Sequence, residues 1–262
     1  MAIHQESAAK QATRDLILDA CKHLQRAPLT YLGMPAEQAK DIITLKSLLQ
    51  NVICIAEQSR ILEEARRSIA GIRLKERRFK VADVWEYLRT EYPHEPLTAD
   101  VAFLDFYGGG LRKEDPFASE ISGLRNYFAK HSHFANRAFV LAWTYMPRDR
   151  GEQKYIDALE RILPDSEMKL LKGTSGVNFR SVAVRLLLLQ ECREHELKAK
   201  LFHHALYKRV MNTIILVFSK GVDTQCTLKL ADPLHLLDEP CCVYDSNATV
   251  PRLMPLLHSL PK

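Results

Sequence analysis

Acidic side chains follow two of the most apolar segments of this 262-residue sequence. Glu57 comes directly after the run Asn51–Ala56, and Asp105 closes the run Val101–Leu104. Placing an ionisable group at the end of a buried strand costs free energy, so a functional role explains these positions better than packing does. A carboxylate there can accept hydrogen bonds from a ligand or take a proton from a nucleophile.

The spacing of these acids indicates a nucleotide site. Glu57 lies 24 residues after Gly33, close to the ~20-residue interval at which an acid binds a ribose in nucleotide-binding α/β folds. Its alternative role is to stabilise the start of the next helix.

Tyr31 and Gly33 belong to the first predicted strand-to-helix turn, Tyr31–Pro35, where a glycine lets backbone amides approach a ligand. Asp83 follows the third predicted strand and can either bind an adenine amino group or cap a helix. Trp85 nearby could supply a face for the adenine base.

The segment that begins at Asp105 is the most specific feature of the sequence. Phe106 and Tyr107 follow the acid, and glycines occupy positions 108–110. We expect Asp105 to bind an amino group of a ligand or to act as a general base, with Tyr107 as an orienting hydroxyl. Phe106 or Tyr107 could also stack on a flat substrate. A surface turn without function is the alternative.

Short apolar runs alternate with amphipathic segments along the first 163 residues, which predicts successive strand–helix units. Such units form a doubly wound, mostly parallel sheet that binds ligands at the carboxyl ends of its strands. Residues 1–27 are expected to form an N-terminal helical extension and residues 28–262 the α/β domain. Beyond these, we expect one or two helices over Phe179–Tyr207, a strong strand over Asn212–Ser219, and weaker strands over Leu228–Leu230 and Cys241–Tyr244. The predicted strands of the first part are Leu29–Gly33, Asn51–Glu57, Phe79–Val84, Val101–Asp105 and Arg137–Tyr145, and its predicted helices are Ala8–Gln25, Ala36–Leu49, Ser59–Ala70, Ser119–Lys130 and Glu152–Leu163.

Composition is that of an ordinary globular protein, with 47% hydrophobic and 26% charged residues. Its apolar runs are shorter than the ~20 residues that cross a bilayer, and its N-terminal residues do not resemble a secretory signal. We therefore expect a cytoplasmic protein without membrane association. The six cysteines form no CxxC pair, and the histidine pairs lack further ligands at suitable spacing, so neither disulfides nor a metal site is expected.

A formal net charge of +5 permits an anionic partner. Basic residues cluster around the third predicted strand and after the fifth, where they could follow the phosphates of a nucleic acid. Glu63, Glu64 and Glu76 are interleaved with the first cluster, so a solvated surface is the alternative. The residues proposed to contact nucleic acid are Arg66, Arg67, Arg73, Lys75, Arg77, Arg78, Arg148 and Arg150.

Taken together, Gly33, Glu57, Asp83 and the segment from Asp105 resemble the successive strand-end motifs of class I S-adenosylmethionine-dependent methyltransferases, over residues 29–163. The resemblance implies a Rossmann-like sheet of seven strands with an antiparallel last strand, in which Asn212–Ser219 and Cys241–Tyr244 would be the closing pair. It implies S-adenosylmethionine as cofactor, a methyl acceptor that could be nucleic acid, and catalysis by Asp105 and Tyr107. The cofactor-binding residues would be Tyr31, Gly33, Glu57, Asp83 and Asp105.

Two departures from the family stand out. The turn Leu32–Ala36 lacks the acid and the several glycines that are common there, and Phe106 with Tyr107 stands where base-amine methyltransferases often have two prolines. A catalytically silent Rossmann-like module that binds nucleic acid or a partner protein therefore remains open. A nicotinamide enzyme is a weaker option, because GxGxxG is missing. All of these arguments require Glu57 and Asp105 to converge on a pocket at the same edge of the sheet.

Overall fold

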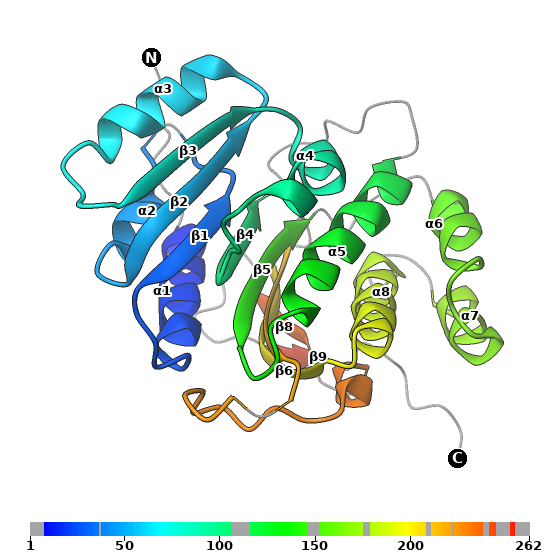
Figure 1. Ribbon diagram of the computed structural model, residues 1–262. Helices are drawn as coiled ribbons and strands as arrows, with labels where there is room; N and C mark the ends of the chain where they lie inside the picture. Colours follow the sequence, from blue (N-terminus) through cyan, green and yellow to red (C-terminus); the bar gives the residue numbers. More distant parts are fainter. Residues whose placement is uncertain are drawn as a thin grey trace.

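The computed structural model describes residues 8–36, 38–105, 116–145, 152–174, 179–207, 211–221, 223–237, 241–244 and 252–254. Strands and helices alternate through the first half of the chain, as the sequence predicts (Figure 1). The strands are β1 Leu29–Gly33, β2 Leu49–Ala56, β3 Glu76–Val81, β4 Val101–Asp105, β5 Phe139–Tyr145, β6 Lys198–Tyr207, β7 Met211–Ser219, β8 Cys241–Tyr244 and β9 Arg252–Met254. The helices are α1 Ala8–Lys22, α2 Lys40–Leu45, α3 Ser59–Ser68, α4 Val84–Thr90, α5 Pro116–Ser132, α6 Glu152–Leu159, α7 Asp165–Lys172 and α8 Phe179–Glu194, with short 3-10 helices η1 Tyr92–His94 and η3 Pro233–Leu236.

The nine described strands form one sheet in the order β3-β2-β1-β4-β5-β7-β6-β8-β9. Strands β1 to β5 are parallel to one another, and β7 lies antiparallel between β5 and β6. This is the doubly wound, mostly parallel sheet with an antiparallel strand that the sequence predicts, so the fold class is confirmed.

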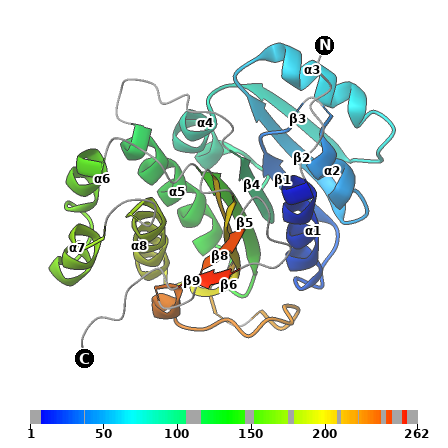
Figure 2. The same cartoon turned by 180° about the vertical axis from the view of Figure 1, so that it is seen from behind.

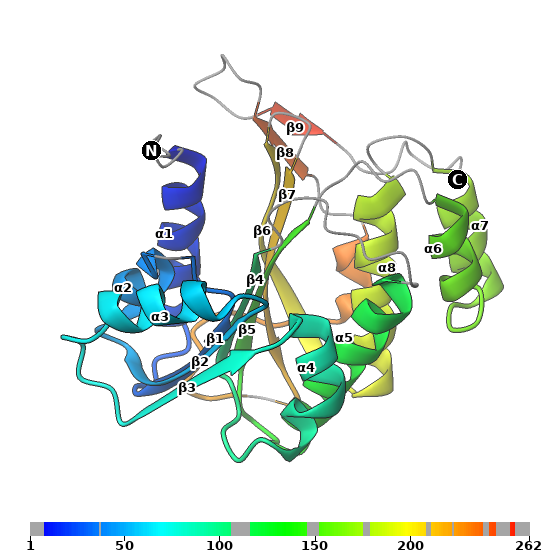
Figure 3. The same ribbon diagram turned by 90° about the horizontal axis from the view of Figure 1, so that it is seen from above.

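Helices cover both faces of the sheet (Figures 2 and 3). Helices α1, α2 and α3 cover one face, which we call the α1 face, and α4, α5 and α8 cover the other, the α5 face, with α6 and α7 packed outside α8. Helix α1 buries Ile17, Ala20 and Cys21, and Leu24 just after it is also buried, so the described part of the N-terminal extension packs into the core.

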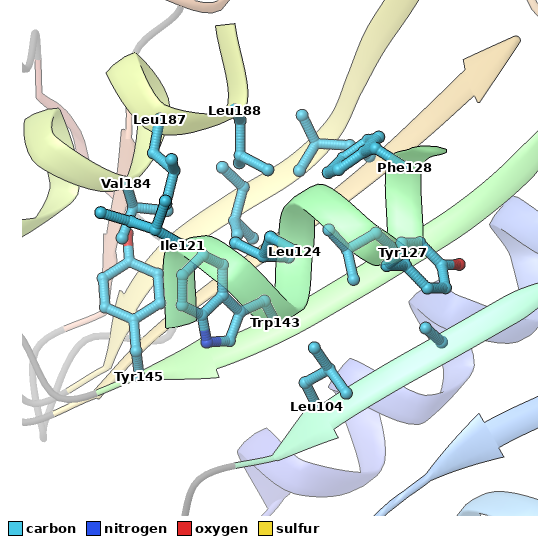
Figure 4. Close-up of a cluster of buried hydrophobic side chains, with 14 of the residues drawn as sticks. Leu104, Ile121, Leu124, Tyr127, Phe128, Trp143, Tyr145, Val184, Leu187 and Leu188 are labelled. Carbon is cyan, nitrogen blue, oxygen red and sulfur yellow. The ribbon is translucent and has the colours of Figure 1, made fainter. Parts of the chain in front are cut away.

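Alternation along the strands supplies both cores. On β4, Phe103 packs on the α1 face and Leu104 on the α5 face. Figure 4 shows Leu104 and Trp143 of the sheet facing Leu124 of α5. Continuous apolar runs are required here because each strand is covered on both sides.

The segment Phe179–Tyr207 is not wholly helical, which corrects the sequence prediction. Helix α8 ends at Glu194, and the chain continues as β6 from Lys198. Glu196 takes the left-handed conformation at φ 55°, and the Leu197 amide donates to the Cys192 carbonyl at 2.8 Å. These are the features of a Schellman helix end, which glycine usually forms. Because no glycine or proline lies between Glu194 and Lys198, the sequence gives no indication that the helix ends there.

The predicted closing pair is also wrong. Strand β7 pairs with β5 and β6, whereas β8 pairs in parallel with β6 and antiparallel with β9. The segment Leu228–Leu230 forms no strand, and an isolated bridge between Ala199 and Ala231 follows it. The pairing differs because β6, which the sequence predicts as part of a helix, lies between β7 and β8.

At the amino ends of the strands, buried ion pairs tie several loops together. Asp100, immediately before β4, accepts hydrogen bonds from Arg26 at 2.8 Å, from Arg137 at 2.6 and 3.0 Å, and from the Thr30 amide at 2.8 Å. Arg26 also reaches Asp223 after β7 at 3.3 Å. We call Arg26, Asp100, Arg137 and Asp223 the amino-edge ion network.

Candidate functional site at the carboxyl edge of the sheet

The order of the strands reverses between β1 and β4, which is where ligands bind in open α/β sheets. Gly33, the last residue of β1, is level with Cys54 of β2 and with Phe103 of β4. Glu57 and Asp105 therefore both lie at the carboxyl edge, on either side of β1. Two strand spacings separate their strands by about 10 Å.

Asp105 is partly buried at the end of β4 and directly opposite Thr144 of β5. Burial raises the pKa of this carboxyl group, and the nearby charge of Asp41 raises it further. Lys10 and Arg14 of α1 and a hydrogen bond with Thr144 act in the opposite direction, and the net direction is upward. A carboxylate with a raised pKa is a better proton acceptor, which suits a general base.

Tyr31 fills the space beside Gly33 on the α1 face. The ring is fully buried, and its hydroxyl donates a hydrogen bond to the Asp41 carboxylate at the start of α2. A Cβ atom at Gly33 would lie 2.1 Å from the Tyr31 hydroxyl oxygen. On this face, the room that the sequence assigns to an approaching ligand is taken by the protein itself.

The other predicted binding residues have separate surroundings. Glu57 is exposed just beyond the end of β2. The Asp83 carboxylate accepts the Glu86 amide at 3.0 Å and so caps α4, which is the alternative role given by its sequence. Trp85 packs edge-on against Trp143 at 5.5 Å, so it belongs to the core. Tyr107 lies outside the described residues.

The structure adds residues that the sequence did not single out. Asp41, Thr144, Lys10 and Arg14 all act on the Tyr31–Asp105 region, and they come from α2, β5 and α1. The place of Thr144 opposite Asp105 depends on the register between β4 and β5. Asp41 lies in a short helix without a distinctive motif, so the sequence does not predict its place beside Tyr31.

The basic residues predicted to contact nucleic acid differ in how far acidic partners compensate their charge. Arg78 is bonded to Glu76 and Glu95, so its charge is compensated. Arg67 lies 4.0 Å from Glu63, Arg66 stacks over the Phe79 ring at 4.6 Å, and Arg77 donates to the Ile72 carbonyl at the end of the α3 turn. Arg73 and Lys75 are exposed before β3.

This cluster lies away from the candidate site. It surrounds the end of α3 and the start of β3, which is the amino edge of the sheet. The six residues of β3 separate it from the carboxyl edge by roughly 20 Å. Arg148 and Arg150 lie outside the described residues.

Two further observations concern the part of the chain that the structure describes. Within it, no group of three or more His, Cys, Asp or Glu side chains is placed to hold a metal ion. None of its helices combines the length and apolar character needed to span a membrane.

No protein-family model and no curated protein matches this chain. Among solved structures it is similar to an O-methyltransferase from Bacillus cereus in complex with SAH, at 15% identity over 83% of this chain and 84% of that one, with a TM-score of 0.46. It is also similar to an rRNA methylase from Streptococcus thermophilus, at 9% identity over 83% of this chain and 99% of that one, with a TM-score of 0.44. At this level of identity the likeness concerns the fold.

Proposed function

We propose that this chain is an S-adenosylmethionine-dependent methyltransferase. The observation that carries the proposal is the pair of acids, Glu57 and Asp105, that flanks β1 at the point where the strand order reverses. An exposed carboxylate beyond β2 suits the two hydroxyls of a ribose, because its oxygens can accept both hydrogen bonds. A partly buried carboxylate on the last residue of β4 suits a proton acceptor.

S-adenosylmethionine supplies a methyl group that is already activated on a sulfonium. The protein's own part is to align the acceptor and remove a proton. Glu57 would hold the ribose of the bound cofactor, which would give its methyl group to the acceptor and keep the electron pair of the broken carbon–sulfur bond on sulfur. Asp105 accepts the proton that the acceptor loses, and in the proposal Tyr107 orients the acceptor.

Calorimetric titration with S-adenosylmethionine tests the cofactor. We expect binding by the wild-type protein and a loss of about tenfold or more in the Glu57→Ala variant, since hydrogen bonds to a charged group are removed. Glu63→Ala, which removes an exposed glutamate of α3, is the matched control and should bind as the wild type does. A folded wild-type protein that binds no cofactor would refute the proposal.

A nucleic acid acceptor extends the proposal. Its support is the exposed charge of Arg66, Arg67, Arg73, Lys75 and Arg77. Because this cluster lies roughly 20 Å from the carboxyl edge, a nucleic acid bound there must be long or folded enough to reach both. A gel shift with RNA and DNA over a salt series tests this: affinity should fall steeply with salt, and Arg73→Glu with Lys75→Glu should reduce the slope. If these two substitutions leave the affinity for nucleic acid unchanged, the cluster is excluded as the nucleic-acid-binding surface.

A second candidate is a catalytically silent module of the same fold that binds nucleic acid or a partner protein. The packing of Tyr31 against Gly33 favours the silent module, because the Tyr31 ring occupies space on the α1 face that a cofactor would need at the first turn. The titration above separates the two candidates, since the silent module binds no cofactor.

A further inference from the structure

Two threonines occupy otherwise apolar rows of side chains at the carboxyl edge of the sheet. On the α1 face, β5 carries Val140 and Ala142 before it reaches Thr144. On the same face, β7 carries Thr213 before Ile215. Both threonines are buried, with 4% and 2% of their surfaces exposed. Valine has nearly the same volume and needs no hydrogen-bond partner, so packing alone does not explain the two hydroxyls.

The two threonines continue a row that begins at Asp105. Thr144 lies directly opposite Asp105 in the pairing of β4 with β5, and Thr213 lies opposite Thr144 in the pairing of β5 with β7. The Thr144 hydroxyl donates a hydrogen bond to the Asp105 carboxylate, and its oxygen is 3.4 Å from the Thr213 hydroxyl oxygen. Because a hydroxyl carries one proton, Thr144 can only accept from Thr213 while it donates to Asp105. The row of hydroxyls is therefore directed toward the proposed general base.

The surroundings of Asp105 act on it in opposite directions. Burial raises the pKa of its carboxyl group and the charge of Asp41 raises it further, whereas the hydrogen bond from Thr144 lowers it. A carboxyl group must be charged before it can accept a proton, and a hydrogen bond to the charged form favours that form where water is excluded. The charged and titratable groups that interact electrostatically with Asp105 are Lys10 and Arg14 of α1, Asp41 of α2 and Tyr31 of β1.

We propose that Thr144 is a positioning residue for Asp105, whose hydroxyl keeps the carboxylate in its proton-accepting form and turns it toward β5. This inference rests on the proposed function, because Asp105 acts as a base only if a methyl acceptor loses a proton to it. Thr213 restricts the directions in which the Thr144 hydroxyl can point. The lysine and arginine of α1 supply positive charge, whereas Thr144 supplies a donor fixed on the neighbouring strand.

Titration of Asp105 by NMR, on the full chain labelled with carbon-13 at its aspartate carboxyl groups and without cofactor, tests this role. The signal that Asp105→Asn removes identifies the group. In Thr144→Val the carboxyl group should bind its proton about threefold or more tightly than in the wild type, because a donor to the charged form is lost. Thr144→Ser keeps the hydroxyl and should restore the affinity to within twofold of the wild type.

Thr30→Val is the matched control. Thr30 is a buried threonine of β1 whose hydroxyl oxygen accepts a hydrogen bond from Asn51 at 3.1 Å, at the amino edge of the sheet. The same chemical change there should leave the titration of Asp105 unaltered.

Each outcome decides for or against the role of Thr144. A change smaller than threefold in a folded Thr144→Val variant, or an equal change in Thr30→Val, overturns it. If Thr144→Val does not fold, the wild type decides: its Thr144 hydroxyl proton must be visible by NMR while Asp105 is charged and must exchange faster with water once Asp105 is protonated. An exchange rate that ignores this protonation overturns the role as well. Because the titration contains no cofactor, a folded wild type that binds no S-adenosylmethionine refutes the proposed function separately.

Discussion

Replacing Gly33 by alanine tests why the first turn contains a glycine. The new Cβ would meet the Tyr31 ring at 2.1 Å from its hydroxyl oxygen, 2.5 Å from Cζ and 2.8 Å from Cε1. The ring cannot move away freely, because it is fully buried and bonded to Asp41. Overpacking of this kind costs about 2 kcal/mol, which should lower Tm by roughly 4–8 °C in a chain of this size.

A double-mutant cycle measured by chemical unfolding provides the assay. In a Tyr31→Leu background the ring is gone, so Gly33→Ala should cost less than about 0.5 kcal/mol and the coupling should reach about 1.5 kcal/mol. Gly71→Ala is the control, since no atom lies within 4 Å of its added Cβ. Equal costs of Gly33→Ala in both backgrounds would show that Tyr31 is not the reason for the glycine.

Three further predictions concern stability. Asp100→Ala should lower the free energy of unfolding by about 3 kcal/mol in urea titration, because it leaves Arg26 and Arg137 without their shared carboxylate; a loss below about 1 kcal/mol would contradict this role. Glu196→Gly should raise Tm by relieving the left-handed backbone, worth about 1 kcal/mol, and a lower Tm would disprove that explanation. Burial lowers the pKa of His131, so the unfolded chain binds its proton more readily and stability falls as the pH drops below 6.5. His131→Phe should flatten this dependence by up to about 1.4 kcal/mol per pH unit, while the same change at the exposed His133 should not.

The parts of the fold that the sequence predicts well are those where local pattern and burial agree. Strands β1 and β4 match their predicted ranges because each is a short apolar run with a clear boundary: β1 is preceded by Pro28 and ends at Gly33, and β4 ends at Asp105. Strand β6 was missed because its boundary is a helix end formed by Glu196. The left-handed conformation of Glu196 is imposed by the backbone hydrogen bonds of the folded structure. A glutamate in the sequence does not predict that conformation.

The candidate site shows the same division. Glu57 and Asp105 could be assigned to one edge from the order of the elements, since parallel strands place their carboxyl ends together. The contacts of Asp41 with Tyr31, and of Thr144 with Asp105, depend on how α2 and β5 pack and on strand register. Position along the sequence does not encode those distances.

The two edges of the sheet carry separate groups of charged residues. The amino-edge ion network ties the loops before β1, β4 and β5 to the segment after β7, at the opposite end from Glu57 and Asp105. Substitution of the exposed Glu57 therefore leaves the amino-edge ion network intact. Such a variant would keep its normal abundance in a cell, whereas loss of the amino-edge ion network would be noticed first as degradation.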